Sequence, residues 1–290
     1  MGTLKGHLIP GAEFMLLSLF LNFIHKADQL RTKERQEVQA NYRNVETEPL
    51  TDVEENKVPI ERPMGIDVEH STNKIKLFFS IFVLTSVVVG MLYEGIGAVL
   101  YKSGSFFEEK GHLVMYFGFL PVAIAYGLES GLFPGSKPVH VRTAPLLSMT
   151  AFALAFFNQW QLLSSHTAMK KPGPDMAFHG LWTSTALMLW VLHIVAVLAK
   201  LANFDSMARI ILLLSPAAFC LQGLWTCLIG IIMFPVYGEM HDDMEMETIH
   251  ALFGLCLVLV CCLQYIWVEL VPAEISLFYL PRSVVPQANF

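Results

Sequence analysis

The fold is decided by the stretch from Met207 to Pro235, which reads MARIILLLSPAAFCLQGLWTCLIGIIMFP. This run is longer than the ~20 apolar residues that cross a ~30 Å hydrocarbon core as an α-helix. A loop of acids and methionines follows from Gly238 to Glu247, and His250 lies at the start of the next apolar stretch. Backbone groups find no water to bond inside a bilayer, so we expect both stretches to be transmembrane helices.

Outward from this stretch, the chain contains seven apolar segments of similar length. They are 7–24, 75–101, 112–133, 144–163, 177–201, 208–236 and 247–270. The 290 residues are 54% hydrophobic and only 15% charged, whereas a soluble domain carries about 25% charged residues. The sequence therefore predicts an all-α fold, a polytopic membrane protein built as a bundle of seven transmembrane helices.

The expected organisation has four parts: an N-terminal segment with the first helix (1–25), a polar cytosolic loop (26–74), six further helices (75–270) and a cytosolic tail (271–290). A signal peptide is the alternative for the first part, but no small-residue cleavage site follows it. The loop has mixed charge and few aromatic residues, so we expect it to be largely disordered. A short surface helix over 31–38 is the alternative there.

Charge distribution predicts the orientation. Net charge is −6, but 11 of the 25 acids lie between Asp28 and Glu69, so the balance describes one loop and gives no evidence for nucleic-acid binding. With seven spans, 14 of the 19 Lys and Arg residues fall on the side of the C-terminus. By the positive-inside rule the N-terminus faces outside or the lumen, and the C-terminus faces the cytosol.

Two carboxylates inside the predicted spans are candidates for function. Ionisable groups in a membrane interior are costly and usually functional. Glu13 and Glu94 both fall in the outer half of the membrane under the predicted orientation. They are the weak catalytic candidates, as a general base beside a metal-bound water.

Histidines begin the odd-numbered spans. His7, His112, His179 and His250 start the first, third, fifth and seventh spans at the outer face, and His166 and His241 lie in outer loops. Imidazole and carboxylate are ligands that zinc prefers, so these four histidines are the candidate ligands of a divalent metal. The alternative is that they are interface residues at helix ends, and both interpretations stay open.

Several motifs resemble the transmembrane protein 45 family of seven-span membrane proteins. They are Gly6-His7-x-x-Pro10-Gly11, His112-x-x-Met115-Tyr116-Phe117, Asp175 with His179, and Gln222-Gly223-x-Trp225. The family's His-x-His ahead of the aspartate is replaced here by Ser164-Ser165-His166, which indicates a divergent member. The resemblance implies a multi-pass protein of Golgi, endosomal or plasma membranes, with no established reaction.

We therefore expect a non-enzymatic membrane protein that acts in trafficking or partner binding. Its partners would be the lipid bilayer and proteins that bind the 26–74 loop or the apolar tail. The alternatives are an intramembrane zinc hydrolase acting on a lipid, by analogy with seven-span enzymes, and a proton or metal transporter.

Overall fold

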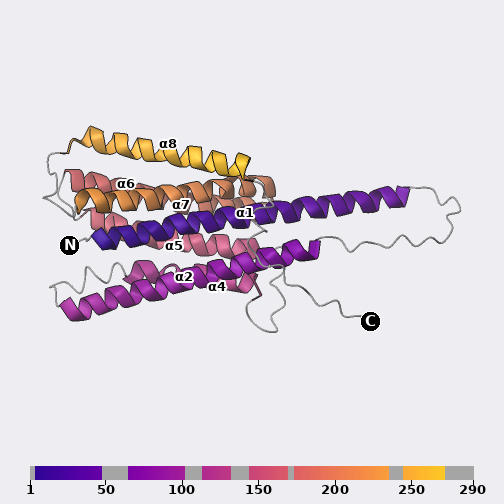
Figure 1. Ribbon diagram of the computed structural model, residues 1–290, viewed down its shortest axis with the longest axis horizontal. Coiled ribbons are helices and arrows are strands. Elements are labelled where there is room, and N and C mark those ends of the chain that lie inside the picture. The colour runs from indigo at the N-terminus through magenta and orange to yellow at the C-terminus, as the bar shows by residue number, and fades with distance from the viewer. Residues whose placement is uncertain are drawn as a thin grey trace.

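The computed structural model describes residues 4–47, 65–101, 113–131, 144–168, 173–234 and 244–271, which are helical apart from short turns (Figure 1). The helices are α1 (Leu4–Thr47), α2 (Gly65–Tyr101), α4 (Leu120–Glu129), α5 (Ala144–Ala168), α6 (Pro174–Leu201), α7 (Asp205–Met233) and α8 (Met246–Leu270). Before α4 the chain is already helical from Leu113, and we call Leu113–Glu129 the 113–129 segment.

Within the described residues, six helices are long and apolar enough to cross a membrane, namely α1, α2, α5, α6, α7 and α8. The prediction of an all-helical, multi-pass membrane protein is confirmed. The third predicted span corresponds to the 113–129 segment, which is shorter than the others. The count of seven spans therefore stays a prediction.

The helices close into a ring. Neighbours around it are α1, α2, the 113–129 segment, α5, α6 and α7, which returns to α1. α8 lies outside this ring against α7 and α6, at the edge of the bundle in Figure 1. Most of its large apolar side chains are exposed, as expected for a helix that faces lipid.

Four phenylalanine rings fill the middle of the ring of helices. Phe14, Phe119, Phe156 and Phe219 come from four different elements, and successive ring centroids are 5.9, 5.5, 5.0 and 6.2 Å apart around the circle. Aromatic pairs at such distances contribute about 0.5–1.5 kcal/mol beyond the burial of their area. This aromatic layer separates two ends of the bundle, which we name the His7 end and the Lys76 end.

A buried ion pair fastens the Lys76 end. Glu129, the last residue of α4, is 6% exposed and lies 3.2 Å from the ammonium nitrogen of Lys76 on α2. The backbone N–H of Ser148 on α5 donates to the same carboxylate at 3.3 Å. These contacts explain how its charge is tolerated inside the bundle.

The structure differs from the expectation of a largely disordered loop over 26–74. α1 continues to Thr47 and α2 begins at Gly65, so 26–47 and 65–74 are helical, and 48–64 lie outside the described residues. The segment after Lys26 is rich in Gln, Glu, Lys and Arg, which are good helix formers. Because the membrane span already provides a helical nucleus, adding these residues to it avoids the cost of nucleation.

Candidate functional site

Two glycines bring the start of α1 against the end of α7. A Cβ added to Gly11 would lie 2.8 Å from the carbonyl oxygen of Gly223, and one added to Gly223 would lie 2.5 Å from that of Gly11. About one turn closer to the start of α1, the thiol of Cys227 on α7 lies 3.8 Å from the Leu8 carbonyl oxygen. This close approach of the two backbones places His7 inside the bundle and not at its rim.

His7 is surrounded by aromatic rings. Its side chain is buried, at 5% exposure. The imidazole stacks on Phe234 with centroids 5.2 Å apart, and lies 5.7 Å from the Trp182 ring and 6.1 Å from the His179 ring. An imidazole in such a setting is held by packing on several sides, so its ring position is defined by α1, α6 and α7 together.

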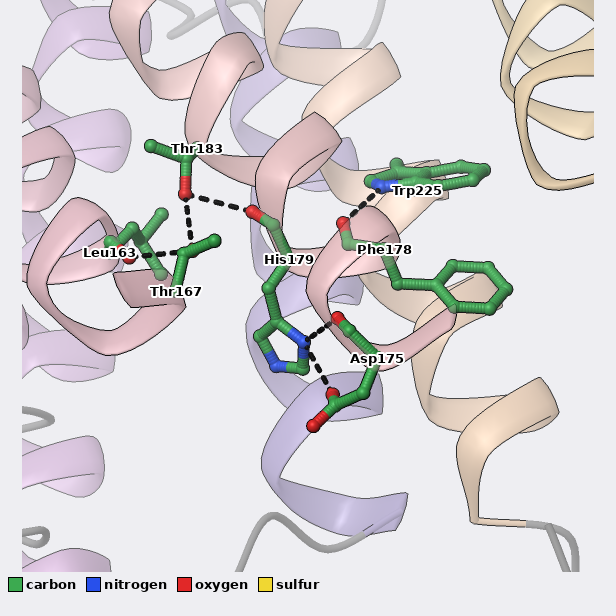
Figure 2. A network of polar contacts seen from close by, with 7 residues as sticks. All are labelled: Leu163, Thr167, Asp175, Phe178, His179, Thr183 and Trp225. Carbon is green, nitrogen blue, oxygen red and sulfur yellow. Dashed lines mark hydrogen bonds and ion pairs between the residues drawn. The ribbon is translucent and has the colours of Figure 1, made fainter. Parts of the chain in front are cut away.

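His179 is oriented by Asp175, one turn earlier on α6 (Figure 2). Its Nδ1 lies 2.9 Å from the Asp175 carboxylate and 2.9 Å from the Asp175 carbonyl oxygen. Both partners are acceptors, so this geometry assigns the proton of a neutral imidazole to Nδ1. Nε2 then carries the lone pair, which is the form of histidine that binds a metal or accepts a proton.

His166, in the last turn of α5, completes the cluster. Its ring centroid is 5.2 Å from that of His179. Beside this pair, the hydroxyls of Thr167 and Thr183 are 2.9 Å apart and join α5 to α6, as Figure 2 shows. This interhelical hydrogen bond therefore holds the turn of α5 that carries His166 level with the turn of α6 that carries His179.

A second interhelical hydrogen bond joins α6 to α7. The indole Nε1 of Trp225 donates to the carbonyl oxygen of Phe178 at 3.1 Å, next to His179 (Figure 2). Trp225 is fully buried. An indole N–H in a membrane interior needs an acceptor, and this one stabilises the backbone that carries His179.

The structure thus gathers His7, His166, His179 and Asp175 from three helices at the His7 end, and we call them the imidazole cluster. Within the described part of the chain, no group of three or more His, Cys, Asp or Glu side chains is arranged to hold a metal ion. The rings pack against one another by edge and face. In this arrangement the cluster offers imidazole nitrogens and one carboxylate beside each other.

One of the other two predicted metal ligands falls within the described residues. His112 falls outside the described residues. His250 is exposed on α8, and its Nδ1 lies 2.7 Å from the carbonyl oxygen of Met246 in the preceding turn. Of the four histidines proposed from the sequence, the structure brings His7 and His179 together.

The two carboxylate candidates are on other faces. Glu13 lines a pocket between α1, α2 and the 113–129 segment. It is six residues from His7, about 240° around an α-helix, so it faces α2 while His7 faces α6. Glu94 is half-buried on α2, and both carboxylates interact electrostatically with Tyr116.

The sequence predicts that His166 lies in a loop, and it gives no role to Trp182 or Phe234. The fourth predicted span ended at 163, whereas α5 runs to Ala168. The spacing of Phe152, Phe156, Gln159 and Leu163, which are all buried, marks the inner face of α5. His166 lies three residues after Leu163 on the same face, so the helical spacing indicates that it also points into the bundle. The aromatic walls carry no comparable signal, because aromatic residues are common throughout the spans.

Comparison with known proteins adds no family: a scan against protein-family models and a search of curated proteins both return no match.

Proposed function

We propose that this chain is a non-enzymatic multi-pass membrane protein that binds a divalent metal ion, zinc by its ligand chemistry, at the imidazole cluster. The observation that carries the proposal is the convergence of His7, His166 and His179 from α1, α5 and α6, with ring centroids 5.2 and 6.1 Å apart. Neutral imidazoles and a carboxylate form a ligand set typical of zinc. Asp175 on Nδ1 of His179 supports the tautomer that ligates through Nε2.

Binding requires the rings to turn their nitrogens toward a common point. Zinc lies ~2.0–2.1 Å from each ligating nitrogen, so two imidazoles on one ion have centroids about as far apart as those of His166 and His179. The required change is a rotation of these side chains, because within the described residues they are not arranged to hold a metal ion. Glu13 faces away from this site, which favours metal binding over hydrolysis of a lipid.

Metal titration of the purified full-length protein tests the proposal. We expect saturable zinc binding by calorimetry and about one equivalent of zinc by elemental analysis. His179→Ala and His7→Ala should each weaken binding at least tenfold, in line with the loss of a ligand or its support. His250→Ala is the matched control, because this histidine is exposed on α8 and should leave the affinity unchanged.

Two outcomes would contradict the proposal: zinc binding that survives a His7→Ala, His179→Ala double variant that folds, or no saturable binding by the parent protein. His112→Ala, tested alone, determines whether a fourth imidazole joins the site.

We also propose that the chain is a divergent relative of the transmembrane protein 45 family, with the N-terminus outside or lumenal, in Golgi, endosomal or plasma membranes. The motif residues support this, because Gly11 of one motif packs on Gly223 of another. A structure-guided alignment with members of that family would test it through the equivalence of these two glycines.

A second candidate function is partner binding through the projecting part of α1. α1 extends well past the other helices of the bundle, as does the beginning of α2 to a lesser degree (Figure 1). Gln36, Gln39 and Ala40 on this part are exposed. Removing 36–47 should change the subcellular distribution of the protein and leave zinc binding intact. An unchanged distribution would contradict this role.

A further inference from the structure

A pocket separate from the imidazole cluster lies between α1, α2 and the 113–129 segment. Its interior volume is about 40 Å³. One water needs roughly 10–15 Å³ of such space, so the pocket has room for a small head group and not for a whole lipid. Its lining residues are Pro10, Glu13, Phe14, Leu17, Val83, Ser86, Val87, Met115, Tyr116 and Phe119.

Glu13, Ser86 and Tyr116 are the polar side chains of an otherwise apolar pocket, and we call the part that they line its polar end. The Glu13 side chain is hydrogen-bonded to Ser86, and the Tyr116 ring lies against Gly90, where an added Cβ would be 2.4 Å from the ring. Among the described residues that line the pocket, none is a Lys, Arg or His. A carboxyl group at this depth in a membrane span is costly unless a partner offsets its charge, so the site is complementary to a cation.

The remaining walls favour the same ligand. Phe14, Tyr116 and Phe119 contribute three aromatic rings, and the centroids of Phe14 and Phe119 are 5.9 Å apart. The faces of aromatic rings attract ammonium groups, more strongly where water is excluded. A carboxyl group beside aromatic rings therefore recognises a positively charged nitrogen better than a neutral head group.

The conformation of the 113–129 segment determines the positions of two of these rings, Tyr116 and Phe119. Pro121 has no N–H, and the chain tightens just before it, where Phe119 N–H bonds the Tyr116 carbonyl oxygen at 3.0 Å. Asn158 on α5 donates to the Val114 carbonyl oxygen at 3.0 Å and holds the tightened turn. Phe119 packs on Phe14 of α1, and Tyr116 lies against Gly90 of α2.

We propose that this pocket binds the primary ammonium group of a membrane-dissolved long-chain amine, with its alkyl chain lying in the bilayer. The group would contact the Glu13 carboxylate and the ring faces, while Ser86 holds the carboxylate in place. A primary ammonium group fits this volume and can donate N–H hydrogen bonds to the carboxylate, whereas a trimethylammonium group has no N–H to donate. This site is independent of the imidazole cluster and stands whether or not the protein binds zinc.

The test uses the full-length protein in lipid nanodiscs with three probes that share a twelve-carbon chain: dodecylamine, dodecanol and dodecyltrimethylammonium. Radiolabelled dodecylamine should bind saturably, and unlabelled amine should displace it, whereas the other two probes should not. Glu13→Gln should lower the affinity for the amine about tenfold or more, because a hydrogen bond to a charged group is lost. Glu269→Gln, an exposed carboxylate on α8, is the matched control and should bind normally.

A second variant covers the case in which Glu13→Gln fails to fold. Ser86→Leu leaves the carboxyl group present and fills the polar end of the pocket, so it should abolish amine binding. Retained binding in either folded variant, or the absence of saturable binding in the parent protein, would overturn the proposal. Equal affinity for dodecanol would also overturn it and would assign the pocket to a hydroxyl group.

Discussion

Gln159 on α5 and Gln222 on α7 are both fully buried, and neither amide atom of either residue has a hydrogen-bond partner in the described part of the chain. Each lies three residues toward the His7 end from Phe156 or Phe219, whose rings are 5.0 Å apart across the middle of the bundle. The two amides therefore form a polar layer next to the aromatic layer. A buried amide without partners costs about 1–3 kcal/mol.

This cost predicts that Gln159→Met stabilises the protein. Methionine has a similar unbranched shape and no amide to desolvate, so we expect the free energy of unfolding to rise by about 1 kcal/mol, measured by thermal unfolding in detergent. The matched control is the neighbouring residue: Asn158 does donate a hydrogen bond, to Val114, and Asn158→Leu should lower stability. A loss of stability in Gln159→Met would show instead that ordered water satisfies the amide.

At the scale of elements, the contact between α1 and α7 determines where the imidazole cluster forms. Gly223 has no room for a side chain, because an added Cβ would lie 2.5 Å from the Gly11 carbonyl oxygen and 2.8 Å from Met15. Small residues at helix interfaces allow this kind of backbone approach in membranes. The position of His7 depends on this close approach, because His7 lies in the first turns of α1 and contacts α6 from there.

Gly223→Ala should therefore separate the two helices, lower the free energy of unfolding by about 1–3 kcal/mol as for other overpacked cores, and weaken zinc binding. Gly254→Ala on α8 is the control, because its added Cβ has open space around it, and alanine is the better helix former by about 1 kcal/mol. Thermal unfolding and metal titration of the two variants measure both effects. Equal behaviour of both variants would exclude a role for the glycine contact.

The projecting part of α1 makes a different prediction. Gln36, Gln39 and Ala40 are exposed, and this part of the helix lies beyond the bundle in Figure 1. Deleting 36–66 should leave the stability of the bundle unchanged to within about 0.5 kcal/mol, as for other changes away from packed regions. Size-exclusion profiles and thermal unfolding measure this, and aggregation of the shortened protein would show that the removed part is packed.

For the whole molecule, the apolar segments predicted the membrane helices because each run is near or above the ~20 residues of a span. The same reasoning missed the helical continuation of α1, since hydropathy detects burial and not helix formation in water. It selected His7 and His179 from their positions at helix starts, and the structure brings these two side chains together. The sequence could not show that Glu13 faces a different side of α1 from His7. The direction in which each face of a helix points depends on its packing partners, such as Gly223, and these are known only from the fold.

The last prediction concerns orientation in the membrane. α1 begins at the His7 end, while the Lys26 ammonium group donates to the Val268 carbonyl oxygen at 2.7 Å, so the end of α8 lies beside Lys26, at the opposite end of the bundle. We therefore expect the start of α1 and the end of α8 to fall on different sides of the membrane. Lys26, Lys76 and Lys200 share the side where α8 ends, and by the positive-inside rule that side is cytosolic.

An N-terminal tag should be accessible to antibody on intact cells, or protected in the lumen of isolated vesicles, and a C-terminal tag should require permeabilisation of the plasma membrane. Access to the C-terminal tag on intact cells would reverse the orientation and place the imidazole cluster on the cytosolic side.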